Sequence, residues 1–216
     1  MRLTRSHTLA LILLTSSLLV SGCNIIAPGM YLLHGRGQVE PVVVLDPFRP
    51  TVVFIDDRAS VLPRRSLRMA IGQEADSTLI EKGVVRQEAL INSAAPLRYA
   101  VDERYGEPRP VSEVGLAVGA DVIIYAECVT WTLSRDGAST SPFAMMRVKI
   151  LDAQNRMHIW PLDGSSAPLR VELPRSAAPL PTTRTEQQAL ERTLAQTLGF
   201  KLARLFYRHE RDQLDG

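Results

Sequence analysis

The sequence predicts an α/β fold, in which a mixed sheet of about 4–6 strands forms one compact domain with helices packed on it. Three observations predict this class. The spacing of apolar residues changes from a helical to a strand period and back along the chain. Residues 122–125 are apolar without a break, which is typical of a central, buried strand. Residues 183–206 combine a capping signal with leucines at helical spacing, which predicts a long amphipathic helix.

The domain is predicted to begin with a strand and a helix. Residues 51–55 are apolar and rich in β-branched side chains, so they predict a buried strand. Pro63 suits a first helical turn, and Gly83 suits the residue after a helix. Between them one apolar stripe recurs every four residues, at Leu67, Ile71, Ala75 and Leu79.

Shorter elements fill the middle of the chain, and turn residues separate them. Ser112 is the expected cap of the second short helix. The last two long strands are expected to form a hairpin that turns near residues 152–155. In chain order these elements are a strand in residues 84–93, helices in residues 96–106 and 111–120, the central strand in residues 121–133, a turn in residues 134–142, strands in residues 143–153, 156–163 and 168–173, and a proline-rich loop in residues 174–185.

The last helix has the clearest signals. Thr183 and Glu186 match a capping box at its start. Basic residues near its carboxyl end, Arg204, Arg208 and Arg211, suit the helix dipole. Its apolar stripe is formed by Leu190, Leu194, Leu198, Leu202 and Leu205.

The first residues predict an export signal. Arg2 and Arg5 precede an apolar run over residues 9–20, which is shorter than the roughly 20 residues of a membrane span and fits a signal peptide. The four residues that end at Cys23, V-S-G-C, resemble the bacterial lipobox. That resemblance implies that the Cys23 thiol carries a diacylglycerol and that the chain is cut before it. The alternative is a free cysteine beside an uncleaved anchor helix.

This resemblance sets the predicted organisation of the chain. Residues 1–22 are a lipoprotein signal peptide, residues 23–50 a lipidated, proline-containing tether, residues 51–210 the α/β envelope domain, and residues 211–216 a tail. Asn24 follows the cysteine. In Gram-negative lipoproteins aspartate at that place favours the inner membrane, so the resemblance implies the periplasmic face of the outer membrane rather than the inner membrane.

Composition excludes some classes of function. Loss of Arg2 and Arg5 from 25 basic residues leaves 23 against 23 acidic ones, and no basic run interleaves with aromatic residues, so we predict no nucleic-acid binding. With Cys23 acylated, Cys128 is the remaining thiol, so no internal disulfide forms. Its position in a strand favours a small buried hydrophobe over a nucleophile.

One pair of carboxylates is a candidate site. Asp56 and Asp57 close the first strand, and carboxyl ends of strands often bear ligands. Together they could hold a divalent cation in an envelope hydrolase, the alternative function. Neighbours in an extended chain point to opposite sides, however. We therefore favour a structural role, in which one carboxylate caps the next helix and the other pairs with Arg58 or Arg64, and we predict no metal and no cofactor.

No familiar catalytic motif stands beside this pair. HExxH, CxxC and GxSxG are absent, and residues 134–137 (SRDG) predict a turn rather than a catalytic loop. The histidines lie far apart in sequence, at His7, His34, His158 and His209. Aromatic residues on the late strands either form an exposed face for a glycan or a protein, or pack in the core; they are Tyr125, Trp131, Phe143 and Trp160.

Two stretches carry a wider resemblance. TVVFIDD at residues 51–57 and EVGLAVGADVIIYAEC at residues 113–128, in this order of elements, resemble a group of envelope proteins. The group comprises relatives of the penicillin-binding-protein activator LpoB, the curli-secretion lipoprotein CsgG and the amino-terminal domain of TolB. The resemblance implies a non-catalytic accessory module that binds an envelope protein, in cell-wall synthesis or a secretion assembly. It carries over no catalytic residue, and no oligomeric state is predicted.

Overall fold

The computed structural model describes residues 37–100 and 109–211. Cys23, the signal peptide, most of the tether and the end of the helix expected in residues 96–106 lie outside these residues. Residues 40–209 form one compact unit. In the other unit, the backbone N–H of Arg211 donates to the carbonyl oxygen of Gly37 at 2.7 Å. A two-stranded sheet pairs β1 (Gln38–Val39) with β10 (His209–Glu210).

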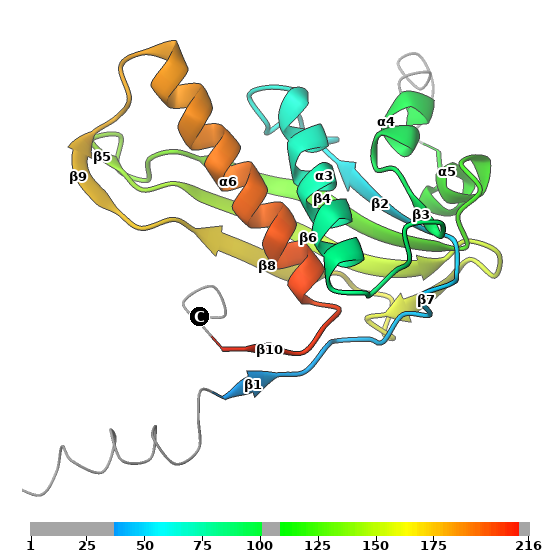
Figure 1. The fold of residues 1–216 in the computed structure, drawn as a ribbon. Coiled ribbons are helices and arrows are strands. Elements are labelled where there is room, and N and C mark those ends of the chain that lie inside the picture. The colour runs from blue at the N-terminus through cyan, green and yellow to red at the C-terminus, as the bar shows by residue number, and fades with distance from the viewer. Residues whose placement is uncertain (1–36, 101–108, 212–216) are drawn as a thin grey trace, which may run out of the picture. The chain divides into compact units, whose positions relative to one another are not determined.

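The main unit contains a six-stranded mixed sheet, which confirms the predicted fold class (Figure 1). The parallel part places β2 (Thr51–Asp56) between β3 (Leu90–Ile91) and β4 (Val122–Thr132). β4 then pairs antiparallel with β6 (Phe143–Asp152). One half of β6 pairs with β7 (Met157–Trp160) in the predicted hairpin, and the other half pairs with β8 (Ala167–Glu172).

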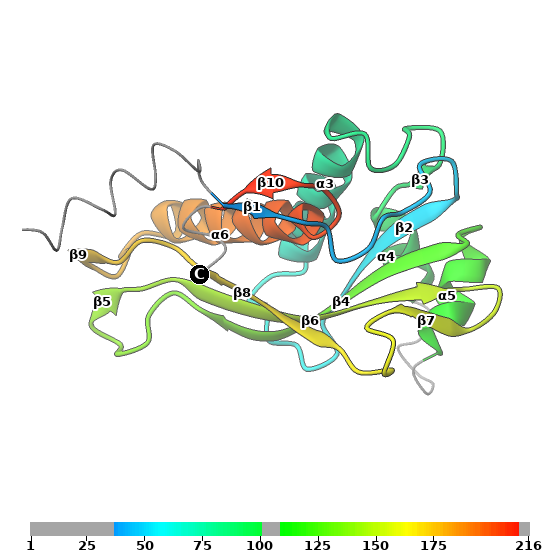
Figure 2. The ribbon, with the colours of Figure 1, turned by 90° about the horizontal axis from the view of Figure 1, so that it is seen from below.

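Helices cover the two faces of the sheet unequally. The long helices α3 (Ser66–Glu81) and α6 (Arg184–Arg204) pack on one face, over the larger core cluster (Figure 2). The short helices α4 (Ala94–Ala100) and α5 (Val111–Ala117) belong to the other face. There a smaller cluster brings Val114 of α5 against Ile123 of β4 and Leu151 of β6. The short helices therefore cover only one end of the second face.

The predicted apolar stripes are the sides on which the long helices pack. All four stripe residues of α3 are buried, and so are Leu194, Leu198 and Leu202 of α6, while Leu190 and Leu205 are half-buried. Thr183 is the N-cap of α6, and its hydroxyl accepts a hydrogen bond from the backbone N–H of Glu186 at 3.2 Å. The capping signal thus marks the residue at which α6 begins, and the leucine stripe marks the side that packs on the sheet.

α3 and α6 approach closely at a glycine. A Cβ atom at Gly199 of α6 would lie 2.3 Å from the carbonyl oxygen of Ile71 on α3. Such a distance is far shorter than a van der Waals contact. Gly199 is therefore required for the spacing between the two helices.

Several predicted boundaries were wrong. Pro63 lies before α3, which begins at Ser66. Ser112 is not a cap, because α5 begins at Val111 with Pro110 as its N-cap and no side-chain hydrogen bond there. Of the strand expected in residues 84–93 only Leu90–Ile91 forms, since residues 86–89 make a turn in which the N–H of Ala89 donates to the carbonyl of Arg86.

The proline-rich loop also contains a strand. β9 (Ser176–Pro179) pairs antiparallel with β5 (Ser139–Thr140), which lies in the predicted turn after the central strand. Backbone hydrogen bonds to a partner distant in sequence thus order part of a stretch whose prolines predict only a loop.

The last part of the expected tether contributes to the main unit. Leu45 is buried in the larger core cluster, and the backbone N–H of Val42 donates to the carbonyl oxygen of Leu205 at 2.8 Å. Residues 40–50 therefore pack with the sheet and helices that follow.

Candidate functional site

The Asp56 carboxylate lies at the carboxyl end of β2 and is surrounded by donors from its own chain. The Tyr125 hydroxyl donates to Oδ2 at 2.8 Å, and Nε of Arg58 donates to the same oxygen at 2.7 Å. The other oxygen accepts the backbone N–H of Asp57 at 2.8 Å. Burial, and then the negative charge of Asp56, raise the pKa of Tyr125, so the phenol remains protonated and donates.

The Asp57 carboxylate organises the following loop. Its two oxygens accept the backbone N–H groups of Val61 at 2.8 Å and Leu62 at 3.3 Å. It therefore holds the loop before α3 instead of capping that helix, whose N-cap is Arg65. The predicted pairing of one carboxylate with Arg58 is present, and Arg64 pairs elsewhere. Among the residues that the structure describes, no three His, Cys, Asp or Glu side chains lie close enough to hold a metal ion.

Two other predicted positions have structural roles. Cys128 of β4 is buried at 3% exposure, and burial raises the pKa of its thiol to about 12, so it is a protonated hydrophobe. Asp136 accepts hydrogen bonds from the backbone N–H groups of Ala138 and Ser139 and from the hydroxyl of Ser134. These bonds lower the pKa of Asp136, those from Ser139 most, and they form a turn, as predicted.

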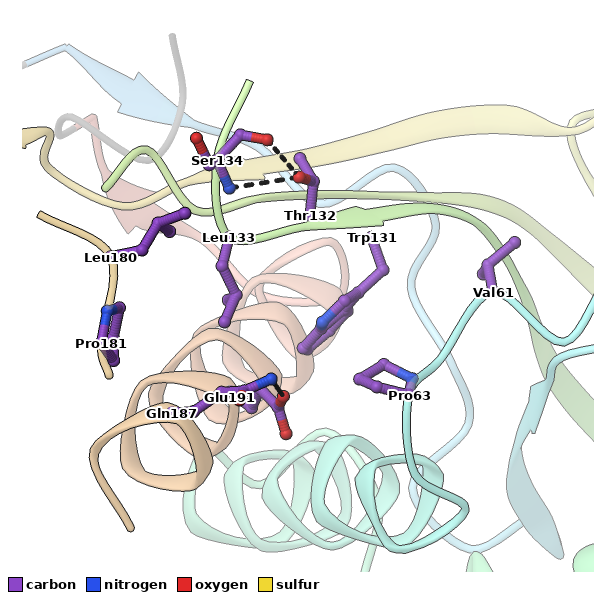
Figure 3. Close-up of a pocket in the computed structure, with 10 residues that line it drawn as sticks. All are labelled: Val61, Pro63, Trp131, Thr132, Leu133, Ser134, Leu180, Pro181, Gln187 and Glu191. Atoms are coloured by element: carbon purple, nitrogen blue, oxygen red, sulfur yellow. Dashed lines mark hydrogen bonds between the residues drawn. The ribbon is translucent and has the colours of Figure 1, made fainter. Parts of the chain in front are cut away.

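A pocket of about 400 Å³ opens beside the carboxyl end of β4 (Figure 3). It is bounded by the loop before α3, the end of β4, the chain before α6 and the first turns of α6. Apolar and polar side chains both contribute to it. The lining residues are Val61, Pro63, Trp131, Thr132, Leu133, Ser134, Leu180, Pro181, Gln187 and Glu191.

The acidic group of this pocket is neutralised by its neighbours. Glu191 is only 1% exposed; its Oε2 pairs with the Arg64 guanidinium at 2.5 Å, and its Oε1 accepts from the Gln187 amide at 3.0 Å. The Trp131 indole N–H has no hydrogen-bond partner among the described residues. That nitrogen is itself buried, so the pocket offers apolar surface, and none of its lining residues is a free general acid or base.

Sequence reasoning missed Glu191. A signal was present, because Glu191 lies three and seven residues before Leu194 and Leu198 and so shares their buried side of α6. A charged residue on an apolar stripe needs a partner when it is buried. Its partner Arg64 is 127 residues away in sequence, so no local pattern identifies the pair.

The aromatic residues of the late strands do not form one face. Trp131 and Trp160 pack against the larger core cluster, while Tyr125 belongs to the smaller cluster on the other face. Phe143 is half-buried on that second face. His158 and His209 lie in different strands, β7 and β10, whereas His7 and His34 lie outside the described residues.

Within residues 37–100 and 109–211, none of the helices has the length and apolar character that crossing a bilayer requires. No protein-family model matches the sequence, and no curated protein matches it.

The chain is similar to several solved structures. One is the PelC dodecamer from Paraburkholderia phytofirmans, at 13% identity, with a TM-score of 0.41, 80% of this chain and 97% of that chain covered. Another is lipoprotein GNA1162 from Neisseria meningitidis, at 9% identity, with a TM-score of 0.39 and coverages of 68% and 96%. The LpoB C-terminal domain from Salmonella enterica follows at 14% identity, with a TM-score of 0.31 and coverages of 67% and 90%. LpoB, which the sequence pattern resembles, is thus among the structures to which the chain is similar.

Proposed function

We propose that this protein is a bacterial lipoprotein, anchored through acyl groups on Cys23, that serves in the cell envelope as a non-catalytic accessory module. The observation that carries the proposal is the order of a basic start, a short apolar run and the V-S-G-C box. A single acyl chain binds a membrane marginally, whereas two or three anchor it stably. Residues 1–22 are then the signal peptide and the mature chain begins at Cys23; Asn24 favours the periplasmic face of the outer membrane.

Lipidation is tested by labelling cells with palmitate. We expect label in the wild type and in Cys128→Ala, whose thiol is buried in the sheet, and no label in Cys23→Ala. The mature wild type should lack residues 1–22 by mass spectrometry. Label that persists in Cys23→Ala, or a mature chain that keeps those residues, would contradict the proposal.

The accessory role means binding of another envelope protein, a cell-wall synthase or a component of a secretion assembly. It is supported by the neutral charge of the mature chain and by the carboxylates of Asp56 and Asp57, which accept hydrogen bonds from the chain itself. Crosslinking in cells, followed by purification of the lipoprotein, is the direct test. We expect one specific envelope protein, and recovery of none would count against a binding role.

A hydrolase with a cation at Asp56 and Asp57 is the second candidate, because two adjacent carboxylates end β2. A hard cation would have to compete with the Tyr125 hydroxyl, the Arg58 guanidinium and three backbone N–H groups for their oxygens. We therefore favour the accessory role.

A further inference from the structure

The second face of the sheet has a part that helices leave open. On β6, alternate side chains point to opposite faces, so Ala144, Met146 and Val148 enter the larger core, while residues 143, 145, 147 and 149 lie on the other face. α4 and α5 cover that face over the smaller cluster, which includes Phe54 of β2, Ile123 of β4 and Leu151 of β6. Over the rest of β4, β6 and β8, no helix among the described residues packs on it (Figure 2).

Basic side chains gather on this open part, which we call the basic sheet face. Arg147 and Lys149 stand on β6, and Arg170 on β8 lies opposite Met145. Arg147 and Arg170 are exposed, and neither makes an ion pair within the described residues. With the charged side chains that adjoin them, this face carries the basic residues Arg58, Arg135, Arg147, Lys149, Arg170 and Arg175 and the acidic residues Asp56, Glu127 and Glu172.

The excess of positive charge is local. The mature chain predicted from the sequence has equal numbers of basic and acidic residues, whereas this face has six basic and three acidic ones. Glu172 is shared, pairing with Arg135 at 2.9 Å and Arg175 at 3.5 Å. A local excess of one sign attracts a partner of the opposite sign and orients its approach.

Apolar groups lie between the charges, flush with the sheet. Phe143 and Met145 are half-buried, and the Arg135 guanidinium lies 4.5 Å from the centre of the Phe143 ring. The Lys149 ammonium lies 5.1 Å from the centre of the Tyr125 ring. Because these rings lie beneath charges, they do not project as bilayer insertion requires, and the Phe143 ring is not free to stack on a sugar. A flat surface of cations and apolar groups instead suits a protein segment with carboxylates and apolar side chains.

We propose that the basic sheet face binds an acidic segment of the envelope partner, with Arg147, Lys149 and Arg170 contacting its carboxylates. This inference rests on the proposed accessory function and names the chemistry of its partner. Because both charges and apolar contacts contribute, binding should weaken with added salt without vanishing.

The test places a photoreactive benzoyl-phenylalanine at Met145 in the full-length lipoprotein, in the bacterium that encodes it. A second version places it at Met69, which is exposed on α3. We expect the Met145 version to crosslink to a protein segment with net negative charge, mapped by mass spectrometry. A crosslink from Met69 alone would be consistent with the accessory function but would contradict binding at the basic sheet face. An adduct at Met145 with lipid or glycan, with a segment that is not acidic, or with nothing would also overturn it.

Charge neutralisation then tests the contact itself. In Arg147→Gln/Arg170→Gln, the mapped segment, made as a peptide, should bind the purified full-length protein in detergent about tenfold more weakly. Glutamine is chosen because Glu127 lies opposite Arg147, where a glutamate would add repulsion. The matched control is Arg184→Gln/Arg192→Gln, which removes two exposed charges from α6. Equal weakening in both variants, or in neither, would refute the assignment, and an unchanged melting temperature verifies that each variant is folded.

Discussion

Asp76 should make the stability of the main unit depend on pH. It lies on α3 at 8% exposure, and its Oδ2 accepts the backbone N–H of Ser93 at 2.9 Å, while Oδ1 has no hydrogen-bond partner among the described residues. Burial raises the pKa of Asp76 from 3.8 to about 6, against the opposing effect of the Ser93 N–H. The folded state therefore retains a proton that the unfolded chain releases between these two pH values.

The direction and size of the pH effect on stability follow from this difference in pKa between the folded and unfolded states. Below pH 3.8 the carboxyl is protonated in both states and does not change the free energy of unfolding. As the pH rises to about 6, only the unfolded state ionises, and the free energy of unfolding falls. Above pH 6 the loss is complete, at about 1.4 kcal/mol per pKa unit and so about 3 kcal/mol in all.

Asp76→Asn removes this titration and keeps an oxygen that can accept from Ser93. Urea unfolding between pH 4 and pH 8 should show the variant more stable than the wild type by up to about 3 kcal/mol above pH 7, with the difference shrinking towards pH 4. Glu88→Gln, an exposed position, is the control and should track the wild type. A difference between Asp76→Asn and the wild type that is constant with pH would refute the reasoning.

Substitutions at three further contacts are each tested by urea unfolding at pH 7. Gly199→Ala should lower the free energy of unfolding by about 2–3 kcal/mol despite the better helix propensity of alanine, because its Cβ would meet the Ile71 carbonyl at 2.3 Å. Gln196→Ala, at an exposed position of the same helix, should change it little, and equal effects of the two substitutions would contradict this reasoning. Arg64→Ala should lower the free energy of unfolding by about 3–5 kcal/mol and Glu191→Gln by clearly less, because only Arg64→Ala leaves the buried Glu191 charge unpaired. A larger loss in Glu191→Gln than in Arg64→Ala would contradict a buried ion pair. Asp56→Asn/Asp57→Asn should destabilise by about 2 kcal/mol or more, with no cation bound by the wild type in calorimetry; a bound Mg²⁺ or Ca²⁺ lost in this variant would favour the hydrolase.

The sequence predicted best those elements in which burial follows a local period. The apolar stripes predicted for α3 and α6 and the unbroken apolar start of β4 pack into the two core clusters, as predicted. It failed at Val84 and Val85, which are buried although they lie in the turn after α3 and not in a strand. A buried turn and a short strand both bring adjacent apolar residues inside, so periodicity alone does not distinguish them.

The site residues could not be predicted in this way, because the chemistry of a buried carboxylate depends on which groups donate hydrogen bonds to it. Asp56 was recognised as a candidate, but one of its donors, Tyr125, is 69 residues away in sequence. Glu191 went unrecognised, and the guanidinium that pairs with it comes from the loop before α3. In both cases the fold, and not the local sequence, decides whether the acid is free for chemistry or bound by the chain. Since donors surround both, neither acid is free, and a partner would meet exposed charges such as Arg147 of β6 and Arg170 of β8, which make no ion pair within the described residues.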